Sequence, residues 1–200
     1  MKKSIGIILA TIWLSVSGCA TPGEKFIDIR FTGDEMIEHS GKIGIAPFVD
    51  NRTGRRDRYV GYRVLMDGSQ ETYLVKEPTL SETLARETRL YFKKKGMQTE
   101  PISAWEPTID GMKTALHDFD RILTARINRF ECRAIKRGMT TDLTLDIDLT
   151  FYLGQADKKT LKTIPVTLTL ERKELGFSEA KLERFVNQSV KEVFKKALVL

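Results

Sequence analysis

The sequence is poor in the residues that most often carry chemistry. Its 200 residues include only two histidines, His39 and His117, and two cysteines, Cys19 and Cys132. Neither histidine stands at a metal-ligand spacing or within a recognisable nucleophile motif. Glycine-rich phosphate loops of the Walker and dinucleotide types are also missing. We therefore predict a protein that is not an enzyme and that has no metal and no cofactor.

Long apolar runs are absent as well, because none approaches the roughly 20 residues of a transmembrane helix. A short apolar run extends from Ile5 to Leu14 and follows Lys2 and Lys3. A positive segment before a short apolar run is typical of an export signal. We expect residues 1–18 to be a signal peptide that is removed.

The end of this segment resembles the lipobox of bacterial lipoprotein signal peptides, and it reads Val16-Ser17-Gly18-Cys19. The resemblance implies that Cys19 becomes the first residue and carries acyl chains, palmitate among them. Several chains hold a protein on its bilayer, whereas one binds only marginally. Ala20 stands where enterobacterial inner-membrane lipoproteins carry aspartate, which implies the periplasmic face of the outer membrane. The alternative is an unmodified cysteine in an ordinary signal peptide.

The mature part is expected to contain a short lipidated tether, residues 19–25, and one periplasmic domain, residues 26–200. The signal peptide holds two of the 33 basic residues, so the domain keeps only a small excess over the 27 acidic ones. This excess suits anionic envelope surroundings, and nucleic acid is not an expected partner. Cys132 is left without an internal disulfide partner. We expect it to be a buried small side chain, and an intermolecular disulfide or a reactive thiol is the alternative.

Alternating apolar residues predict three long strands in an antiparallel meander with one apolar face. The second strand is the clearest, with Leu143, Leu145, Ile147, Leu149 and Phe151 on one side. The first covers 121–136 and changes phase near Asn128-Arg129, which indicates a bulge. The third covers 164–170, and Pro165 favours an edge position for it.

Shorter strands and the helices complete the expected fold. The strands are 26–31, 42–49, 59–66, 72–75 and 97–102, with a hairpin turn at Asp67-Gly68. One helix begins at the capping box of Thr79 and ends at Gly96, and another follows Ser178, with a weaker helical stretch at 111–117. The sequence thus predicts an α+β domain. It has a mixed, largely antiparallel sheet with two main amphipathic helices packed on one face.

A segment rich in arginine and tyrosine follows the second expected strand. Its residues are Arg52, Arg55, Arg56, Arg58, Tyr59, Tyr62 and Arg63. Guanidinium groups bind phosphate and carboxylate oxygens in pairs and stack on rings, so this surface is a candidate docking site for an envelope protein, a glycan or a lipid headgroup. The alternative is a solvated loop in which the arginines pair with Asp50 and Asp57.

Three other hypotheses remain open. His117 with Asp118 and Asp120 would form the site of an envelope hydrolase if they met in a concave pocket. Carriage of an apolar ligand would require an unfilled cavity between the sheet and the helices.

The third hypothesis is a calcium site formed by Asp142, Asp146 and Asp148, which share one strand face. Alternating acidic residues are equally typical of a solvated sheet face.

The layout as a whole resembles the YajG-type lipoproteins of the bacterial envelope. The resemblance rests on Asp50-Asn51-Arg52, on Val60-Gly61-Tyr62-Arg63, on the helix closed by Lys-Lys-Gly, and on the strand start from Leu123 to Phe130. It extends from about Lys42 to the C-terminus. More remotely, the chain is similar to the α/β domains of the TolB amino-terminal region and of LpoB. The resemblance brings no catalytic residues and implies a non-enzymatic accessory role in envelope assembly or transport.

Overall fold

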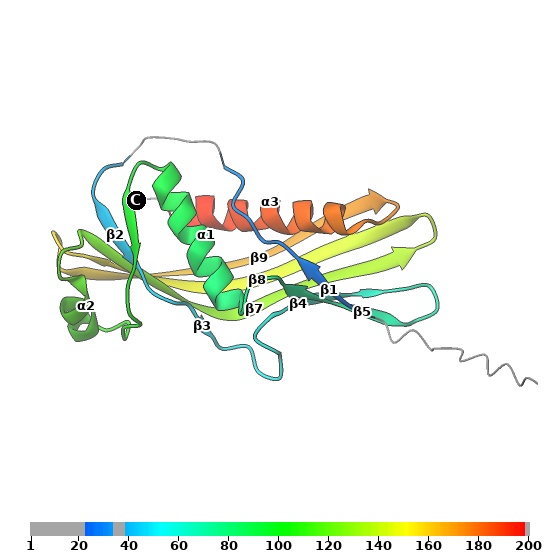
Figure 1. Ribbon diagram of the computed structural model, residues 1–200, viewed down its shortest axis with the longest axis horizontal. Helices are drawn as coiled ribbons and strands as arrows, with labels where there is room; N and C mark the ends of the chain where they lie inside the picture. Colours follow the sequence, from blue (N-terminus) through cyan, green and yellow to red (C-terminus); the bar gives the residue numbers. More distant parts are fainter. Residues whose placement is uncertain (1–22, 34–38, 199–200) are drawn as a thin grey trace, which may run out of the picture.

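The computed structural model describes residues 23–33 and 39–198, which form a single sheet with three helices (Figure 1). The predicted signal peptide and Cys19 lie outside the described residues. The elements in chain order are β1 (Glu24–Ile27), β2 (Lys42–Ile45), β3 (Val49–Asp50), β4 (Tyr59–Val64), β5 (Gln70–Val75), α1 (Leu80–Lys94), β6 (Gln98–Pro101), α2 (Ile109–Leu116), β7 (Arg121–Arg137), β8 (Thr140–Gln155), β9 (Thr160–Leu175) and α3 (Glu179–Ala197). None of the described helices combines the length and apolar character needed to cross a bilayer.

The three longest strands, β7, β8 and β9, form the antiparallel meander that the alternation predicts. The register of β7 against β8 shifts between Ile127 and Arg129, which confirms the predicted bulge. In the described part of the chain β9 pairs with β8 alone, so Pro165 lies on an edge strand as expected.

The sheet is mixed, and the prediction that it is largely antiparallel is wrong. Five of the eight pairings among the described strands are parallel. β2, β3 and β4 lie one after another along the same edge of β7, each parallel to it. The long connection through α1, β6 and α2 returns the chain to the start of β7 in the same direction. Alternation predicts where strands lie along the chain, and it carries no information on their direction.

α1 and α3 cover one face of the sheet, as expected for the two main helices (Figure 1). Their apolar faces share a core with the meander, in which the Phe194 ring lies 5.8 Å from Tyr91 and 6.5 Å from Phe151. Both predicted N-caps form. The Thr79 hydroxyl accepts a hydrogen bond from the Glu82 amide at 3.1 Å, and the Ser178 hydroxyl accepts one from Lys181 at 3.3 Å.

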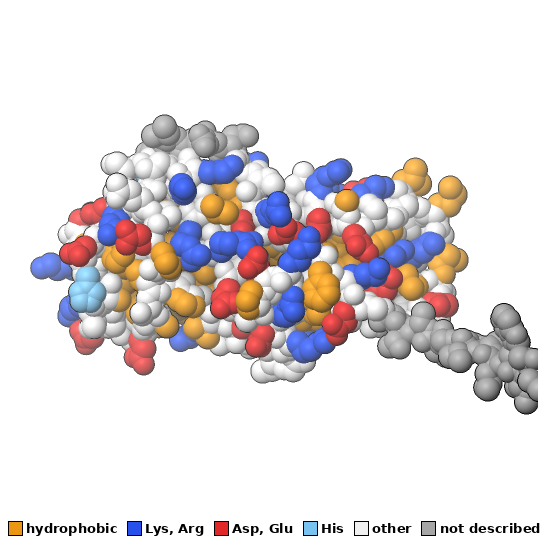
Figure 2. All heavy atoms as spheres, viewed as in Figure 1, with side chains coloured by type: hydrophobic (Ala, Val, Ile, Leu, Met, Phe, Trp, Pro, Cys, Tyr) orange, Lys and Arg blue, Asp and Glu red, His pale blue; other side chains and the backbone are white. Residues whose placement is uncertain are grey.

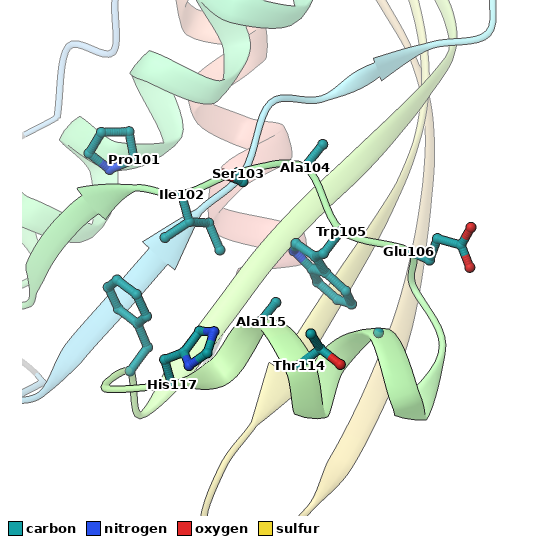
Figure 3. A pocket seen from close by; sticks show the side chains of 11 residues that line it. Pro101, Ile102, Ser103, Ala104, Trp105, Glu106, Thr114, Ala115 and His117 are labelled. Atoms are coloured by element: carbon teal, nitrogen blue, oxygen red, sulfur yellow. The ribbon is translucent and has the colours of Figure 1, made fainter.

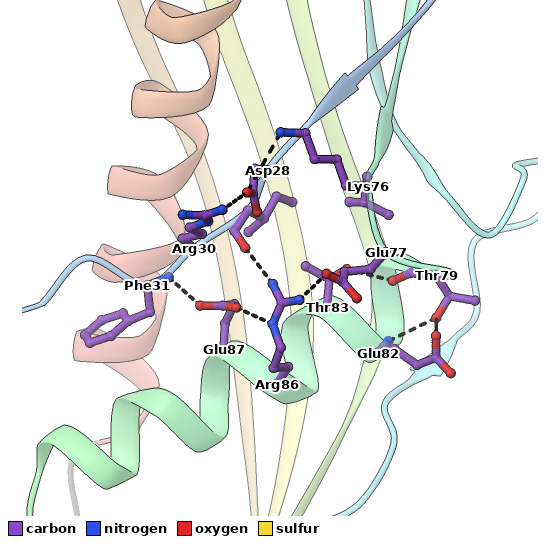
Figure 4. Close-up of polar contacts among 12 residues, drawn as sticks. Asp28, Arg30, Phe31, Lys76, Glu77, Thr79, Glu82, Thr83, Arg86 and Glu87 are labelled. Carbon is purple, nitrogen blue, oxygen red and sulfur yellow. Dashed lines mark hydrogen bonds and ion pairs between the residues drawn. The ribbon is translucent and has the colours of Figure 1, made fainter.

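The segment after β1 is held to these two helices by polar contacts, and those with α1 are drawn in Figure 4. The buried carboxylate of Glu87 accepts a hydrogen bond from the Phe31 amide at 2.5 Å and pairs with Arg86 at 2.7 Å. The Asp28 amide donates to Glu183 of α3 at 2.9 Å. The buried Glu87 charge is thus fully partnered, and it joins the N-terminal segment to the core.

α2 packs on the opposite face of the sheet, at the end where β7 begins. Met112 is fully buried there, beside Ile122 and Gly154, which are register partners on β7 and β8. A Cβ on Gly154 would lie 2.7 Å from the Met112 side chain. We call this the α2 end of the molecule. The other end, where β7 and β8 meet in a turn, lies about 50 Å away, since β7 has 17 residues at about 3.3 Å each.

Candidate functional site

A hollow of about 690 Å³, which we call the cup, lies between α2 and the segment after β6 (Figure 3). Most of its lining is apolar and comes from Pro101, Ile102, Ala104, Trp105, Ala115 and Phe119. Ser103, Glu106, Thr114 and His117 supply the polar atoms. The mixture of apolar walls with a few polar groups is typical of ligand sites.

Local sequence explains the shape of the cup. The Thr108 hydroxyl caps α2 by accepting a hydrogen bond from the Gly111 amide at 3.1 Å. Gly111 lets the preceding loop approach closely, because a Cβ there would lie 2.3 Å from the Glu106 carbonyl oxygen. α2 ends at His117, whose φ of 33° falls in the left-handed region that residues other than glycine seldom adopt. The turn at His117 directs the chain back to β7.

Trp105 forms a wall of the cup, and its indole nitrogen has an unusual environment. The indole Nε1 is buried, and no hydrogen-bond partner for it exists among the described residues. An unpaired buried donor costs about 1–3 kcal/mol, so this indole N–H is an unsatisfied polar group in the wall of a ligand-sized hollow. The sequence reasoning missed Trp105. The available signal was a large aromatic residue in a loop between Pro101 and Pro107.

Two further hollows continue from the cup along the face of the sheet that α1 and α3 leave free. The first, about 460 Å³, shares Trp105 and Glu106 with the cup and also contacts Arg126 and Tyr152. The second, about 240 Å³, lies beside the β7 bulge; its lining includes Arg52, Arg55, Asn128, Arg129 and Glu131. We call the three hollows together the groove. β7 forms the floor of the two further hollows from Thr124 to Glu131, a length of about 25 Å.

The arginine-rich segment lies at the far end of this groove. Asp50 and Gly61 pair with Ile127 and Cys132 of β7, so the chain between them is longer than the stretch of β7 that it accompanies. The surplus residues loop outward. The surface loop predicted from the sequence is therefore present. The structure also shows which side chains of this loop have partners within the chain.

Arg52 is a buried structural residue, with 5% of its side chain exposed. Its guanidinium group donates to both oxygens of Asp50, at 2.8 and 2.7 Å, as the pairing alternative predicts. It also donates to the carbonyl oxygens of Tyr59, at 2.7 Å, and Phe130, at 3.1 Å. Arg52 thereby joins the loop to β7.

Arg55 and Tyr59 form a second cluster around Glu131. The Arg55 guanidinium pairs with Glu131 and stacks 4.6 Å from the centre of the Tyr59 ring, while the Tyr59 hydroxyl donates to Glu131 at 3.0 Å. Burial first, and then the Glu131 charge, raise the pKa of Tyr59 above its ordinary value. The Arg55 side chain remains 47% exposed, so it can still meet a ligand in the groove.

The remaining residues of the segment face away from the groove. Arg58 donates to the Val75 carbonyl oxygen at 2.9 Å, and Arg56 pairs with Glu24. Arg63 stacks 3.9 Å from the centre of the Phe177 ring and pairs with Glu71.

Tyr62 is half-buried in β4, opposite Arg133 of β7. Of the seven predicted docking residues, Arg52 and Arg55 are the two that line the groove.

The hydrolase hypothesis receives limited geometric support. His117 does line a concave site, but it is exposed at the rim, and among the described residues it makes no hydrogen bond to a carboxylate. Asp120 instead accepts a hydrogen bond from the Lys42 amide at 2.6 Å. The Glu106 side chain points away from His117 (Figure 3). No acid–base pair is assembled in the cup.

The acidic face of β8 is partnered by arginine. Asp146 contacts Arg133 at 2.9 Å and Arg129 at 3.1 Å and accepts a hydrogen bond from Thr169 at 2.7 Å. The described residues contain no group of three metal-ligating side chains. This face is therefore a network of ion pairs rather than an open set of oxygen ligands.

Cys132 lies in the core on β7 with 1% of its surface exposed, which confirms the expected burial. Burial raises the pKa of the thiol to about 12. At neutral pH the thiol is protonated and shielded from solvent.

Comparisons with known proteins address the fold. No family model and no curated protein match the chain. Among solved structures, a Xanthomonas campestris protein of family DUF330 is similar over 88% of this chain and 95% of its own, with a TM-score of 0.52 and 15% identity. A Neisseria meningitidis lipoprotein is similar over 77% and 98%, with a TM-score of 0.32 and 9% identity. A Helicobacter pylori homologue of neuraminyllactose-binding hemagglutinin is similar over 82% and 84%, with a TM-score of 0.40 and 6% identity.

The chain thus shares its fold with the Xanthomonas protein. The resemblance to YajG-type lipoproteins stays a prediction.

Proposed function

We propose that this chain is a non-enzymatic binding protein of the bacterial envelope, held by acylated Cys19 on the periplasmic face of the outer membrane. Its groove binds an extended segment of another envelope protein. The role is accessory, in envelope assembly or transport. The lipobox resemblance supports the location, and the geometry of the groove supports the binding.

The observation that carries the proposal is the unpaired indole N–H of Trp105 in an apolar cup. An apolar side chain of the partner fills the cup and recovers free energy from burial, at about 25 cal/mol per Å². The Trp105 side chain turns on binding, so that its buried indole N–H donates to a backbone carbonyl of the same segment. The cup alone would suit many apolar ligands, so the rest of the groove decides the ligand class.

The groove favours a peptide because it is long, open and lined by charge beyond the cup. Its floor of about 25 Å matches an extended segment of about eight residues at about 3.3 Å each. Arg126, Arg129 and Arg55 line this part, and the latter two are 57% and 47% exposed. Exposed guanidinium groups pair well with carboxylates. The expected segment therefore carries an apolar anchor followed by acidic residues.

Site-specific photo-crosslinking in living cells tests the proposal. A photoreactive amino acid replaces Ala104, an exposed residue in the wall of the cup, and in a control strain it replaces Lys158, in the β8–β9 turn. We expect a defined protein adduct from position 104 and none of the same mass from position 158. The substitution Ala115→Trp fills the cup and should abolish the adduct. An adduct that persists in the filled variant, or no adduct at all from position 104, contradicts the proposal.

Carriage of an apolar envelope ligand is a second candidate, because the apolar lining of the cup favours it. The cup lies outside the interface between the sheet and α1 or α3 where such a cavity was expected, and the core there is filled by packed side chains. Binding of the apolar dye N-phenyl-1-naphthylamine, lost in Ala115→Trp, would favour this candidate. If the Ala115→Trp protein bound the dye as tightly as the wild type does, the cup would be excluded as the carrier site.

A further inference from the structure

The most exposed apolar side chains of the described residues gather at one end of the molecule. Met139 is 81% exposed, Met66 72% and Leu175 70%, whereas the other exposed large apolar side chains do not pass 49%. Met66 and Met139 stand in turns between strands, and Leu175 ends β9 just before the connection to α3. Hydrophobic side chains stand out at the right-hand end of the molecule in Figure 2.

Strand registers place all three at the same level. Val64, two residues before Met66, pairs with Ile135 of β7. The β7–β8 turn follows and contains Met139, whose carbonyl oxygen accepts a hydrogen bond from the Gly176 amide at 2.9 Å, next to Leu175. The three side chains therefore belong to one surface, which we call the turn end (Figure 1).

The chain enters the fold from this end. Glu24, the first residue of β1, pairs in parallel with Thr72 of β5, and β5 itself begins just after the turn that carries Met66. The start of β1 at Glu24 therefore lies on the side of the turns. Cys19 precedes Glu24 by five positions, a reach of at most about 18 Å at 3.3–3.6 Å per residue.

We propose that the turn end rests on the bilayer that holds Cys19, with the Met66, Met139 and Leu175 side chains inserted among the lipid headgroups and the first methylenes. This inference rests on the acyl anchor of the proposed function. A tether of at most about 18 Å keeps the nearest face of the domain at the membrane, and that face is the one with exposed apolar side chains. Apolar side chains at the boundary between headgroups and acyl chains gain free energy from burial, as in interfacial helices.

Charged residues suit this placement. The side chains of Arg137 and Lys173 are 68% and 70% exposed at the turn end, and their long stems allow their charges to reach lipid phosphates. Both contact Asp142, at 2.8 and 3.8 Å, which keeps them beside the apolar tips. The consequence for function is an orientation: the cup faces the periplasm about 50 Å above the bilayer.

Tryptophan fluorescence of the lipidated mature protein tests the contact. The protein is purified from membranes and reconstituted in phosphatidylcholine vesicles with or without bromine on the acyl chains. In a Trp105→Phe background, Met139→Trp reports on the turn end and Lys158→Trp reports on the α2 end. We expect brominated lipid to quench the first by at least about twofold more than the second, because bromine acts only at close range to an inserted ring. Equal quenching at the two positions overturns the proposal.

Further variants separate insertion from anchoring. In the Met139→Trp protein, adding Met66→Asp and Leu175→Asp should reduce quenching, whereas Ile109→Asp, at a moderately exposed site at the α2 end, should leave it unchanged. Flotation of each protein with the vesicles measures the anchor independently. Failure to float shows that the lipid anchor of the proposed function is wrong, and flotation without quenching at position 139 overturns the insertion alone. Sedimentation that reveals a dimer together with an unquenched position 139 would assign the turn end to a second copy of the chain.

Discussion

Arg52 offers the sharpest test of the structural reasoning. The sequence suggested a docking residue, whereas the structure shows a buried side chain that joins the loop to β7. Arg52→Ala removes four hydrogen bonds, two to Asp50 and one each to the carbonyl oxygens of Tyr59 and Phe130. Asp50, with 19% of its side chain exposed, is left without its countercharge. Breaking one partner of a buried ion pair typically costs about 3–5 kcal/mol, and we expect a loss in this range.

Urea unfolding of the mature protein measures this loss. The matched control is Arg56→Ala, which removes an exposed pair to Glu24 and should change the free energy of unfolding by less than about 1 kcal/mol. Arg52→Lys keeps the charge without the planar fork and should give an intermediate loss. A loss below about 1 kcal/mol for Arg52→Ala would refute the structural role.

The same variant has a defined pH dependence. Burial acts to raise the pKa of Asp50, but the hydrogen bonds and charge of Arg52 outweigh burial and hold the pKa below its ordinary value. The pair therefore contributes fully above about pH 4 and loses its contribution as the pH falls through the lowered pKa. The difference in stability between wild type and Arg52→Ala should be largest at neutral pH and should shrink below about pH 4. A difference independent of pH would contradict the ion pair as its source.

Three further predictions concern the cup and the core. Trp105→Phe should change the free energy of unfolding by no more than about 1 kcal/mol, because it deletes an unpaired donor. The same substitution should weaken the crosslink from position 104, and an unchanged crosslink would exclude a binding role for the indole. Met112→Ala should cost about 2–5 kcal/mol in urea unfolding and expose the α2 amides to hydrogen exchange, and a cost below about 1 kcal/mol would show that α2 is held by other contacts. The Cys132 thiol, whose pKa burial raises to about 12, should resist an aromatic disulfide reagent at pH 8 until the protein is denatured; rapid labelling of the native protein would contradict its burial.

Local patterns in the sequence predicted the elements of this fold well. The N-cap at Thr79, the bulge near Asn128 and the edge position of Pro165 all follow from short-range chemistry, and all three are confirmed. Of the predicted capping box only this half forms as expected, since the Glu82 carboxylate accepts from the Thr79 hydroxyl and not from its amide. Strand direction was wrong because it depends on where long connections lead the chain. The segment between Ile45 and Arg121 contains the long connection that returns the chain to the start of β7. No residue pattern predicts which edge of the sheet this connection reaches.

The candidate site was only partly accessible from sequence. Arginine density indicated the loop beside the groove, but whether a guanidinium group is buried or free depends on distant carbonyl oxygens, such as that of Phe130 for Arg52. The cup was missed because it forms between α2 and the loop after β6, and its lining residues look ordinary one by one. The turn end was missed for a similar reason, since Met66, Met139 and Leu175 are far apart in the chain.

Both the proposed location and the membrane contact require that Cys19 holds the protein on a bilayer. Intact-mass spectrometry of the native protein extracted from membranes tests this most directly. We predict a chain that begins at Cys19 and carries the added mass of a diacylglyceryl group and acyl chains. A free thiol at Cys19, or residues 1–18 still attached, would contradict the account.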